Sequence, residues 1–168
     1  MNTFKELKPA ELQDNPFKLI GTDWMLITAG MEGAFNTMTA SWGGLGVLWE
    51  QDVAFAFVRP TRHTFGFMEQ APVFTLSFFA EQHRPALDYC GTHSGRDVNK
   101  VAQTGLTPEF GAAGEIYFAE ARLVLVCRKL HAQDLDPAGF RDPALAGFYP
   151  QRDYHRLYVG GILRALAR

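Results

Sequence analysis

The sequence has little of several features that mark specialised protein classes. Its two cysteines, Cys90 and Cys127, are too few for a disulfide framework and indicate a reducing, cytoplasmic environment. The 16 basic and 18 acidic residues nearly balance, which gives no electrostatic footprint for nucleic acid. No apolar run is long enough to span a bilayer, and the first residues lack the layout of a signal peptide. We therefore expect a cytoplasmic protein that binds neither nucleic acid nor membrane.

What the sequence does have is enough apolar material for a sizeable core. Of its 168 residues 47% are hydrophobic, and 14 of them are phenylalanine. Such a composition excludes a disordered chain, and the length suits one domain over residues 1–168. We find no internal repeat and no linker.

Short strands dominate the pattern, with short helices between them. Strands are expected at residues 24–28, 35–41, 45–49, 53–58, 73–79, 116–129 and 155–166. Helices are expected at residues 61–70, 84–90 and 97–103, with further helix starts at Asn15-Pro16, Asp136-Pro137 and Asp142-Pro143. The early strands are tightly connected, and Glu32-Gly33 is typical of a hairpin turn. These features favour a mostly β, antiparallel barrel or meander.

One strand is unusually polar. Residues 36–44 read NTMTASWGG and lie between two apolar stretches. Amide and hydroxyl groups in such a place carry a desolvation penalty unless a flat polar ligand docks against them.

A basic turn follows at residues 59–64, with the sequence RPTRHT. With Thr61 as the N-cap of a helix, the free amides of the first turn would face one point, and Arg59 and Thr64 would add donors there. Such an arrangement suits a phosphate. The alternative is a solvated basic turn without a ligand.

A second basic segment favours the phosphate. If Asp97 caps the next helix, Lys100 lies in its first turn, where a positive charge opposes the helix dipole. An external anion facing Arg96 and Lys100 would explain this placement, although Asp97 alone could relieve it. The two segments together predict a phosphorylated aromatic cofactor.

Other chemistries find less support. Gly44 and Gly46 begin a dinucleotide fingerprint, but Trp49 occupies its third glycine position, and strands rather than a helix follow. The five histidines are scattered, the cysteines lack zinc-ligand spacing, and no sequence feature puts a base beside Cys90. We expect no metal site, no Rossmann site and no thiol nucleophile.

Several strings together resemble the flavin reductase-like family, and its flavoredoxin-type branch in particular. They are NTMTASWGGLGVLW (36–49), RPTRHT (59–64), FTLSFF (74–79), CGTHSGRDVNK (90–100), EARLVLVCRKL (120–130), QDLDP (133–137) and FYPQRDYHRLYVG (148–160). The resemblance covers nearly the whole chain in order. It implies an antiparallel FMN-binding split β-barrel, mostly β with short helices, that forms a homodimer.

The resemblance also assigns cofactor-binding residues. The polar strand would line the flavin ring and its ribityl chain, and the basic turn at 59–64 would hold the phosphate. The strand at 74–79 would pass along the flavin, and the loop within residues 90–100 would close over it. The residues so implied are Asn36, Thr37, Met38, Thr39, Ala40, Ser41, Trp42, Arg59, Arg62, His63, Thr64, Ser77, Phe78, Phe79, Cys90, Gly91, Ser94, Gly95, Arg96, Lys100, Tyr154 and His155.

The function implied is an FMN-dependent oxidoreductase. NAD(P)H would deliver a hydride to flavin N5, and free flavin, another small molecule or a protein would accept the electrons. No side chain need act as nucleophile or base, and Asn36, Lys100 or a backbone amide of residues 37–41 would stabilise the reduced flavin. One alternative is a flavoredoxin-like, non-enzymatic electron carrier, and another is a pyridoxal-type phosphate oxidase on a related barrel.

Overall fold

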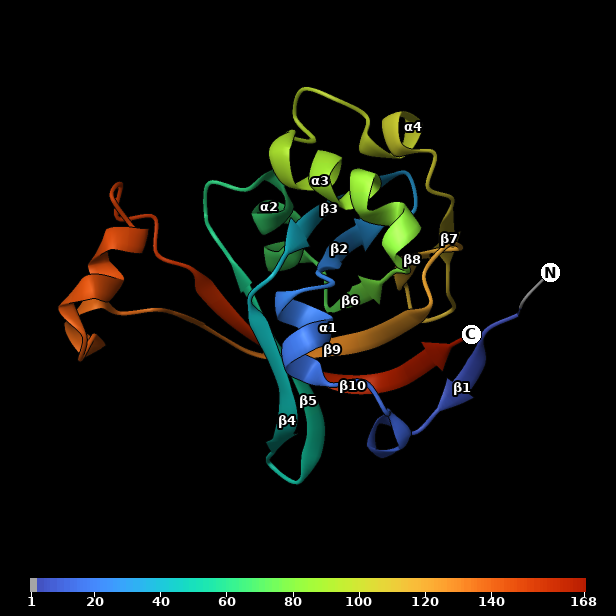
Figure 1. Ribbon diagram of the computed structural model, residues 1–168, viewed down its shortest axis with the longest axis horizontal. Helices are drawn as coiled ribbons and strands as arrows, with labels where there is room; N and C mark the ends of the chain where they lie inside the picture. Colours follow the sequence, from blue (N-terminus) through green and yellow to red (C-terminus); the bar gives the residue numbers. More distant parts are fainter. Residues whose placement is uncertain (1–2) are drawn as a thin grey trace.

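A computed structural model describes residues 3–168, and an antiparallel sheet dominates it (Figure 1). The sheet has eight strands in the order β3-β2-β6-β9-β10-β5-β4, with β1 paired to β10. A small second sheet pairs β7 with β8. The strands are β1 (Lys5–Leu7), β2 (Met25–Met31), β3 (Ala34–Ala40), β4 (Gly43–Leu48), β5 (Gln51–Val58), β6 (Val73–Phe78), β7 (Pro108–Phe110), β8 (Ile116–Phe118), β9 (Leu123–Asp134) and β10 (Arg156–Ala167).

The sheet curves into a barrel because its two end strands are neighbours in sequence. β3 and β4 lie at opposite ends of the strand order, yet only Ser41 and Trp42 connect them. The sheet must bend until these edges approach, which is the geometry of a split barrel. Gly43 lies at this junction, where a Cβ atom would come within 2.8 Å of the Phe55 carbonyl oxygen. The prediction of an antiparallel split barrel is confirmed.

Short helices cover the sheet and its ends. They are α1 (Pro16–Gly21), α2 (His63–Gln70), α3 (Arg84–Thr92) and α4 (Lys100–Thr104), with 3₁₀ turns η1 (Pro9–Glu11), η2 (Glu81–His83), η3 (Pro137–Gly139) and η4 (Pro143–Phe148). Figure 1 shows α3 and α4 together above the edge formed by β3 and β2. Within residues 3–168, none of the helices has the length and apolar character that crossing a membrane requires.

Two hydrophobic clusters lie on the two sides of the sheet. Leu125 and Cys127 of β9 face the cluster that contains Phe74 and Tyr158. Val124 and Val126 face the other cluster, beneath Leu87 of α3. Both faces of β9 are therefore buried over residues 123–127, and this explains why its sequence is continuously apolar in that half of the strand.

Several local predictions are confirmed. The Asn15 side chain caps α1 by accepting a hydrogen bond of 3.0 Å from the Phe17 amide. Residues 32–33 form the turn of the β2–β3 hairpin, with Gly33 at a φ of 81°. The Asp136 and Asp142 side chains cap the 3₁₀ turns η3 and η4, each at 2.9 Å. Short polar side chains at helix starts satisfy amides that have no partner inside the helix.

The strand predicted at residues 116–129 is wrong as a single element. It divides into β8 and β9, because the chain bends between Phe118 and Leu123. The Ala121 amide bonds to the Phe118 carbonyl at 3.0 Å, and the Glu120 carboxylate accepts a hydrogen bond from the Thr107 amide at 3.0 Å. The three-residue strands β1 and β7 were not predicted, since segments so short carry little periodic signal.

The connection between β9 and β10 projects away from the barrel as an arm (Figure 1). We use this name for residues 135–155, which contain η3 and η4. At its base an ion pair of 2.8 Å joins Asp153 to Arg59, which directly follows β5.

Candidate functional site

A small polar pocket lies where β3, the start of α2, the loop after α3 and the start of α4 meet. Its volume is about 260 Å³, and we call it the anion pocket. Its lining comprises Asn36, Thr61, Arg62, His63, Thr64, Gly91, Thr92, His93, Ser94, Gly95, Arg96 and Lys100. The structure thus brings together the polar strand, the basic turn and the second basic segment, which are far apart in the sequence.

Asn36 and Thr64 join the strand to the helix at the pocket. The Asn36 Nδ2 atom donates to Thr64 Oγ1 at 2.8 Å, and both side chains are buried. Thr64 lies in the first turn of α2, whose cap is Arg62 rather than the predicted Thr61. The first amides of a helix have no partner within it, so this end of α2 offers N–H donors and positive potential.

Gly95 brings the loop after α3 into close contact with Asn36. A Cβ atom at position 95 would lie only 2.0 Å from Asn36 Oδ1. Any side chain here would displace either the loop or the Asn36 amide. The glycine therefore permits the loop to form one wall of the pocket.

Lys100 is the most deeply buried cation of the pocket, with 5% of its surface exposed. It is the first residue of α4, which Asn99 caps instead of the predicted Asp97. Its Nζ atom donates to the Thr37 and Cys90 carbonyl oxygens, each at 2.8 Å. An ammonium group has three donors, so one remains after these two bonds. Burial lowers the pKa of Lys100 to about 8, although the interaction with Cys90 acts in the opposite direction.

Two arginines add positive charge. Arg62 donates to the Cys90 carbonyl at 3.5 Å, and Arg96 donates to the Thr61 carbonyl at 3.4 Å. Within residues 3–168, neither arginine nor Lys100 forms an ion pair with a carboxylate.

Burial lowers the pKa of Arg62, and Arg59 lowers it further. Burial also lowers the pKa of His63, with Arg96 and Lys100 acting in the same direction. A bound anion would relieve the repulsion among these cationic groups.

Arg59, which was predicted to hold the phosphate, is not at this pocket. Its guanidinium binds Asp153 Oδ2 and the Phe148 carbonyl, each at 2.8 Å, and lies over the Tyr149 ring. β5 pairs with β10, so the residue that follows β5 reaches the arm that precedes β10. Arg59 therefore anchors the arm.

The side chains of β3 beyond Asn36 are mostly engaged in the fold. Thr37 bonds to Thr28 at 2.8 Å, Thr39 donates to the Leu87 carbonyl, Met38 is buried, and Ala40 packs against the same cluster. However, β3 is an edge strand, so one side of its backbone lacks a strand partner. Lys100 already uses this side by bonding to the Thr37 carbonyl. The backbone of β3, rather than its side chains, is what a ligand would meet.

Ser77, Phe78 and Phe79 lie in the interior, away from the anion pocket. Phe78 and Phe79 are buried in the two hydrophobic clusters. The Ser77 hydroxyl is buried without a hydrogen-bond partner among the described residues.

The Cys90 thiol is buried too, and burial raises its pKa. Cys90 faces the pocket's cations through its carbonyl oxygen, which accepts from Lys100 and Arg62.

Trp42, Tyr154 and His155 form a separate aromatic cluster at the base of the arm. The Trp42 ring lies 5.1 Å from that of His155 and 5.6 Å from that of Phe148. His155 Nδ1 bonds to the Tyr149 hydroxyl at 2.8 Å, and burial lowers the pKa of His155 to about 4. Tyr154 packs on Tyr149 at 4.9 Å. The string at 148–160 signalled this cluster, but the parts of Phe148 and Tyr149 in it were not predicted.

A hollow of about 440 Å³ lies beside this cluster, between α1 and the start of β4. Phe17, Ile20, Ser41, Trp42 and Phe57 are among its lining residues. Most of the predicted site residues fall into two groups, which β3 connects, whereas Arg59 is paired with Asp153 and Ser77, Phe78 and Phe79 are buried in the interior. The polar group surrounds the anion pocket, and the aromatic group lies where β3 passes into β4.

Comparison with solved structures supports the fold. An FMN-binding domain of a flavin reductases-like enzyme from Shewanella baltica has 18% identity and a TM-score of 0.72, over 99% of this chain and 78% of that one. Flavoredoxin from Methanosarcina acetivorans has 20% identity and a TM-score of 0.68, over 96% and 76%. An NADH:FAD oxidoreductase from Streptomyces globisporus has 16% identity and a TM-score of 0.64, over 86% and 73%. A search of the curated proteins gave no match.

The family model of the flavin reductase like domain matches residues 17–167. This range contains the anion pocket, the edge strand β3 and the arm. The chain therefore belongs to the flavin reductase like domain family.

Proposed function

We propose that this protein is an FMN-dependent oxidoreductase that takes electrons from NAD(P)H and passes them to free flavin or another acceptor. The observation that carries the proposal is the anion pocket, where Lys100, Arg62 and Arg96 meet a helix start beside an edge strand. Membership of the family and the FMN-binding proteins among its structural neighbours support the choice of FMN.

The residues of the anion pocket fit a phosphate monoester. Lys100 has one donor left, the Thr64 hydroxyl lies at the pocket, and the first amides of α2 are open. Arg62 and Arg96 would balance the charge of a dianion. We propose that Thr64, Lys100, Arg62 and Arg96 hold the phosphate, and that the open backbone edge of β3 binds the polar edge of the ring.

When bound, FMN supplies the redox centre, which accepts a hydride at N5. The protein's part is to orient the ring, exclude water and supply donors. Trp42 and the arm would frame the ring at the far end of β3 from the anion pocket. Within residues 3–168, no group of three or more His, Cys, Asp or Glu side chains has metal-binding geometry.

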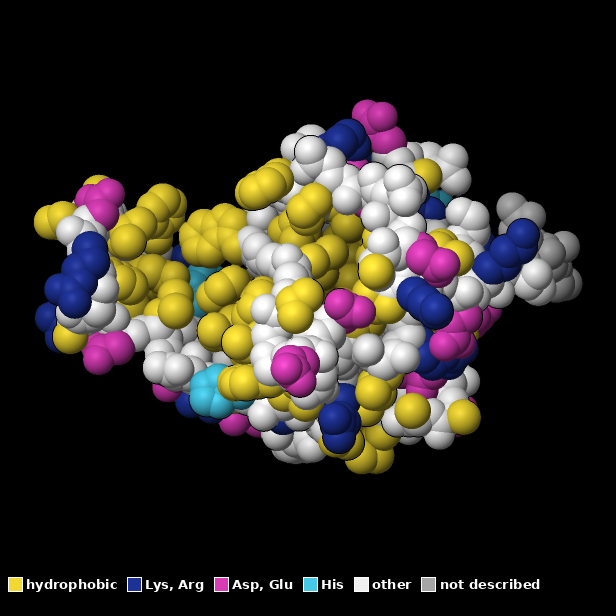
Figure 2. Space-filling view, turned by 90° about the horizontal axis from the view of Figure 1, so that it is seen from below, with side chains coloured by type: hydrophobic (Ala, Val, Ile, Leu, Met, Phe, Trp, Pro, Cys, Tyr) yellow, Lys and Arg dark blue, Asp and Glu magenta, His cyan; other side chains and the backbone are white. Residues whose placement is uncertain are grey.

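We further propose a homodimer. Several large apolar side chains are exposed near the arm and the adjoining hollow, among them Phe17 at 86%, Trp42 at 45% and Phe148 at 53%. Figure 2 shows hydrophobic side chains along the arm and across the neighbouring face of the barrel. A second copy would cover this surface. Light scattering at micromolar concentration should give twice the chain mass, and a monomer mass with FMN still tightly bound would contradict a shared site.

Anaerobic mixing of the purified holo-protein with NADH and then NADPH tests the reductase directly. We expect one of them to bleach the flavin absorbance quickly, with turnover once free flavin is added. Dithionite serves as the control, since it reduces the flavin in either case.

The competing function is a non-enzymatic electron carrier. The flavoredoxins among the structural neighbours favour it. If neither nucleotide reduces the flavin at millimolar concentration while dithionite does, the carrier function is correct.

A further inference from the structure

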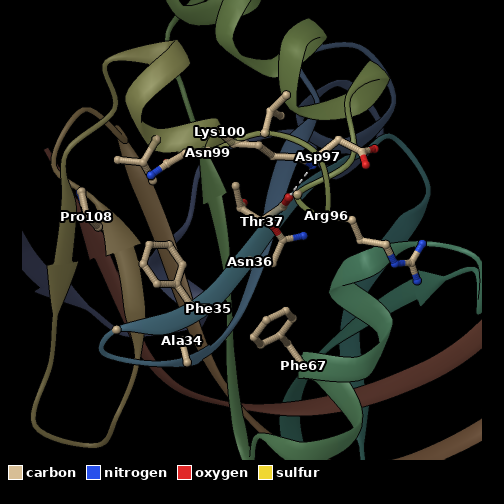
Figure 3. Close-up of a pocket in the computed structure, with 14 residues that line it drawn as sticks. Ala34, Phe35, Asn36, Thr37, Phe67, Arg96, Asp97, Asn99, Lys100 and Pro108 are labelled. Carbon is tan, nitrogen blue, oxygen red and sulfur yellow. Dashed lines mark hydrogen bonds between the residues drawn. The ribbon is translucent and has the colours of Figure 1, made fainter.

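The strand β3 has a polar end and an aromatic end, and a buried histidine lies at the aromatic one. At the polar end Lys100 donates to the Thr37 carbonyl oxygen (Figure 3). At the other end the chain passes through Trp42 into β4, and the Trp42 ring lies 5.1 Å from that of His155. The Phe57 ring stands perpendicular to the same imidazole at 6.4 Å. His155 is 9% exposed, so little of its imidazole reaches solvent.

One hydrogen bond from the arm fixes this imidazole. The Tyr149 hydroxyl lies 2.8 Å from Nδ1 of His155, and both side chains are buried. The Tyr149 ring is itself held on two sides, because the Arg59 guanidinium lies over it and Tyr154 packs on it at 4.9 Å. The hydroxyl is therefore held in place against Nδ1.

The direction of the bond follows from what each group can donate. A tyrosine hydroxyl has one proton, and within residues 3–168 the Tyr149 hydroxyl has no acceptor other than Nδ1 of His155. Burial raises the pKa of Tyr149, although Arg59 acts in the opposite direction, so the hydroxyl keeps its proton at neutral pH. Nδ1 is therefore the acceptor. A neutral imidazole that accepts at Nδ1 carries its own proton on Nε2.

The Nε2 atom of His155 is open to a ligand. In the described part of the chain it forms no hydrogen bond, yet it is not among the atoms sealed from solvent without a partner, which are Ser77 Oγ and Asp153 Oδ1. Burial lowers the pKa of His155 to about 4. Of the neighbouring charges, Arg59 and Arg62 also lower it, whereas Asp153 raises it. The imidazole is therefore neutral at physiological pH and offers one N–H group.

We propose that Tyr149 is a positioning residue, which holds His155 in the neutral tautomer whose Nε2–H donates to a carbonyl oxygen of the bound flavin ring. Without the Tyr149 hydroxyl both tautomers become accessible, and one of them turns a bare nitrogen toward that oxygen. A fixed donor gains strength when negative charge develops on the oxygen that it faces, and no proton need be transferred. This inference rests on the proposed function, because it takes the ring to lie where β3 passes into β4.

Nitrogen NMR of the flavin-free, full-length chain with labelled histidines tests the tautomer directly. We expect one neutral form of His155, protonated at Nε2, and its signal is identified by its absence in His155→Gln. Tyr149→Phe keeps the ring and removes the hydroxyl, so both tautomers should appear. The pKa of His155 should also rise by roughly 0.4–1 pH unit in this variant, because only the neutral imidazole accepts the lost bond.

Tyr117→Phe is the matched control, since it makes the same change in the small sheet, where Tyr117 packs on Phe4. Riboflavin titration then follows the ring alone, because riboflavin has no phosphate for the anion pocket. Tyr149→Phe should weaken riboflavin roughly two- to tenfold, as expected for one hydrogen bond, and Tyr117→Phe should not.

Three results would overturn the inference and leave FMN binding itself intact. They are an Nδ1–H tautomer in the natural chain, an unchanged tautomer in Tyr149→Phe, and equal riboflavin affinity in Tyr149→Phe and Tyr117→Phe. If no flavin binds to any of these chains, the proposed function fails, whereas an Nε2–H tautomer that depends on Tyr149 would still support the positioning of His155.

Discussion

The amide of Asn36 donates a hydrogen bond of 2.8 Å to the hydroxyl of Thr64, 28 residues further along the chain. Both groups are buried, so each relies on the other for its hydrogen bonding. The bond fixes the first turn of α2 against the edge strand β3. It thereby aligns the two elements from which the proposed flavin site is built.

Thr64→Val should weaken FMN much more than riboflavin, which lacks the phosphate. The change removes a hydroxyl from the anion pocket and leaves the Asn36 amide without its partner, an effect worth ~1–3 kcal/mol. We expect a loss of roughly five- to 150-fold in FMN affinity. Fluorescence titration of both flavins measures it, and Thr64→Ser, which keeps the hydroxyl, should restore binding. An equal loss for both flavins would assign Thr64 to the fold alone.

Lys100 should make phosphate binding depend on pH. Its pKa is lowered to about 8, so above pH 8 the free protein loses the proton that a bound phosphate requires. FMN affinity should then fall by up to about tenfold per pH unit above 8, while riboflavin affinity stays nearly constant. Lys100→Met should abolish this difference. A flat FMN profile from pH 7 to 10 in the natural protein would contradict the prediction.

The lowered pKa of Lys100 also affects the free energy of unfolding, which should rise with pH where FMN affinity falls. Between pH 8 and 10.5 the unfolded chain holds a proton on Lys100 that the flavin-free folded protein has released. Stability therefore rises with pH across this window, and below pH 8 the buried charge destabilises the fold by a constant amount. Chemical denaturation at pH 8 and pH 10 should show a smaller rise in Lys100→Met than in the natural chain.

Arg59 and Arg62 should respond differently to replacement by alanine. Arg62 and Arg96 line the anion pocket, whereas Arg59 is paired with Asp153 at the base of the arm. Arg62→Ala should weaken FMN roughly ten- to hundredfold and riboflavin little, as expected for loss of a charge-assisted bond of ~1.5–3 kcal/mol. Arg59→Ala should change both flavins equally, through the arm. A phosphate-selective loss in Arg59→Ala alone would show that the arginine leaves Asp153 when ligand binds.

Gly95→Ala should impair FMN binding more than its small size suggests. The added Cβ atom would lie 2.0 Å from Asn36 Oδ1, so the loop or the amide must move. Gly66→Ala in α2 is the matched control, because nothing lies within 4 Å of a Cβ atom there and Gly66 does not line the anion pocket. Calorimetric titration with FMN should separate the two variants, and similar affinities in both would show that the loop adapts without penalty.

The features that were predictable from sequence are local or repetitive. Asn15 before Pro16 predicts a capped helix, and the turn at residues 32–33 predicts a hairpin, because each depends on neighbouring residues. The placement of Arg59 was not predictable, since its partner Asp153 lies 94 residues away. Long-range pairing decides which side of a turn faces a pocket, and one sequence carries no signal for it.

The two-residue connection between β3 and β4 gives Trp42 a mechanical role. Ser41 and Trp42 tie opposite edges of the sheet covalently, so the barrel cannot widen at this seam without pulling on them. The Trp42 ring also contacts His155, at the point where the arm re-enters the barrel as β10. Widening of the barrel at the seam would therefore also displace the arm. With Trp24 and Trp49 replaced by phenylalanine, indole emission from Trp42 should report widening of the barrel and displacement of the arm together.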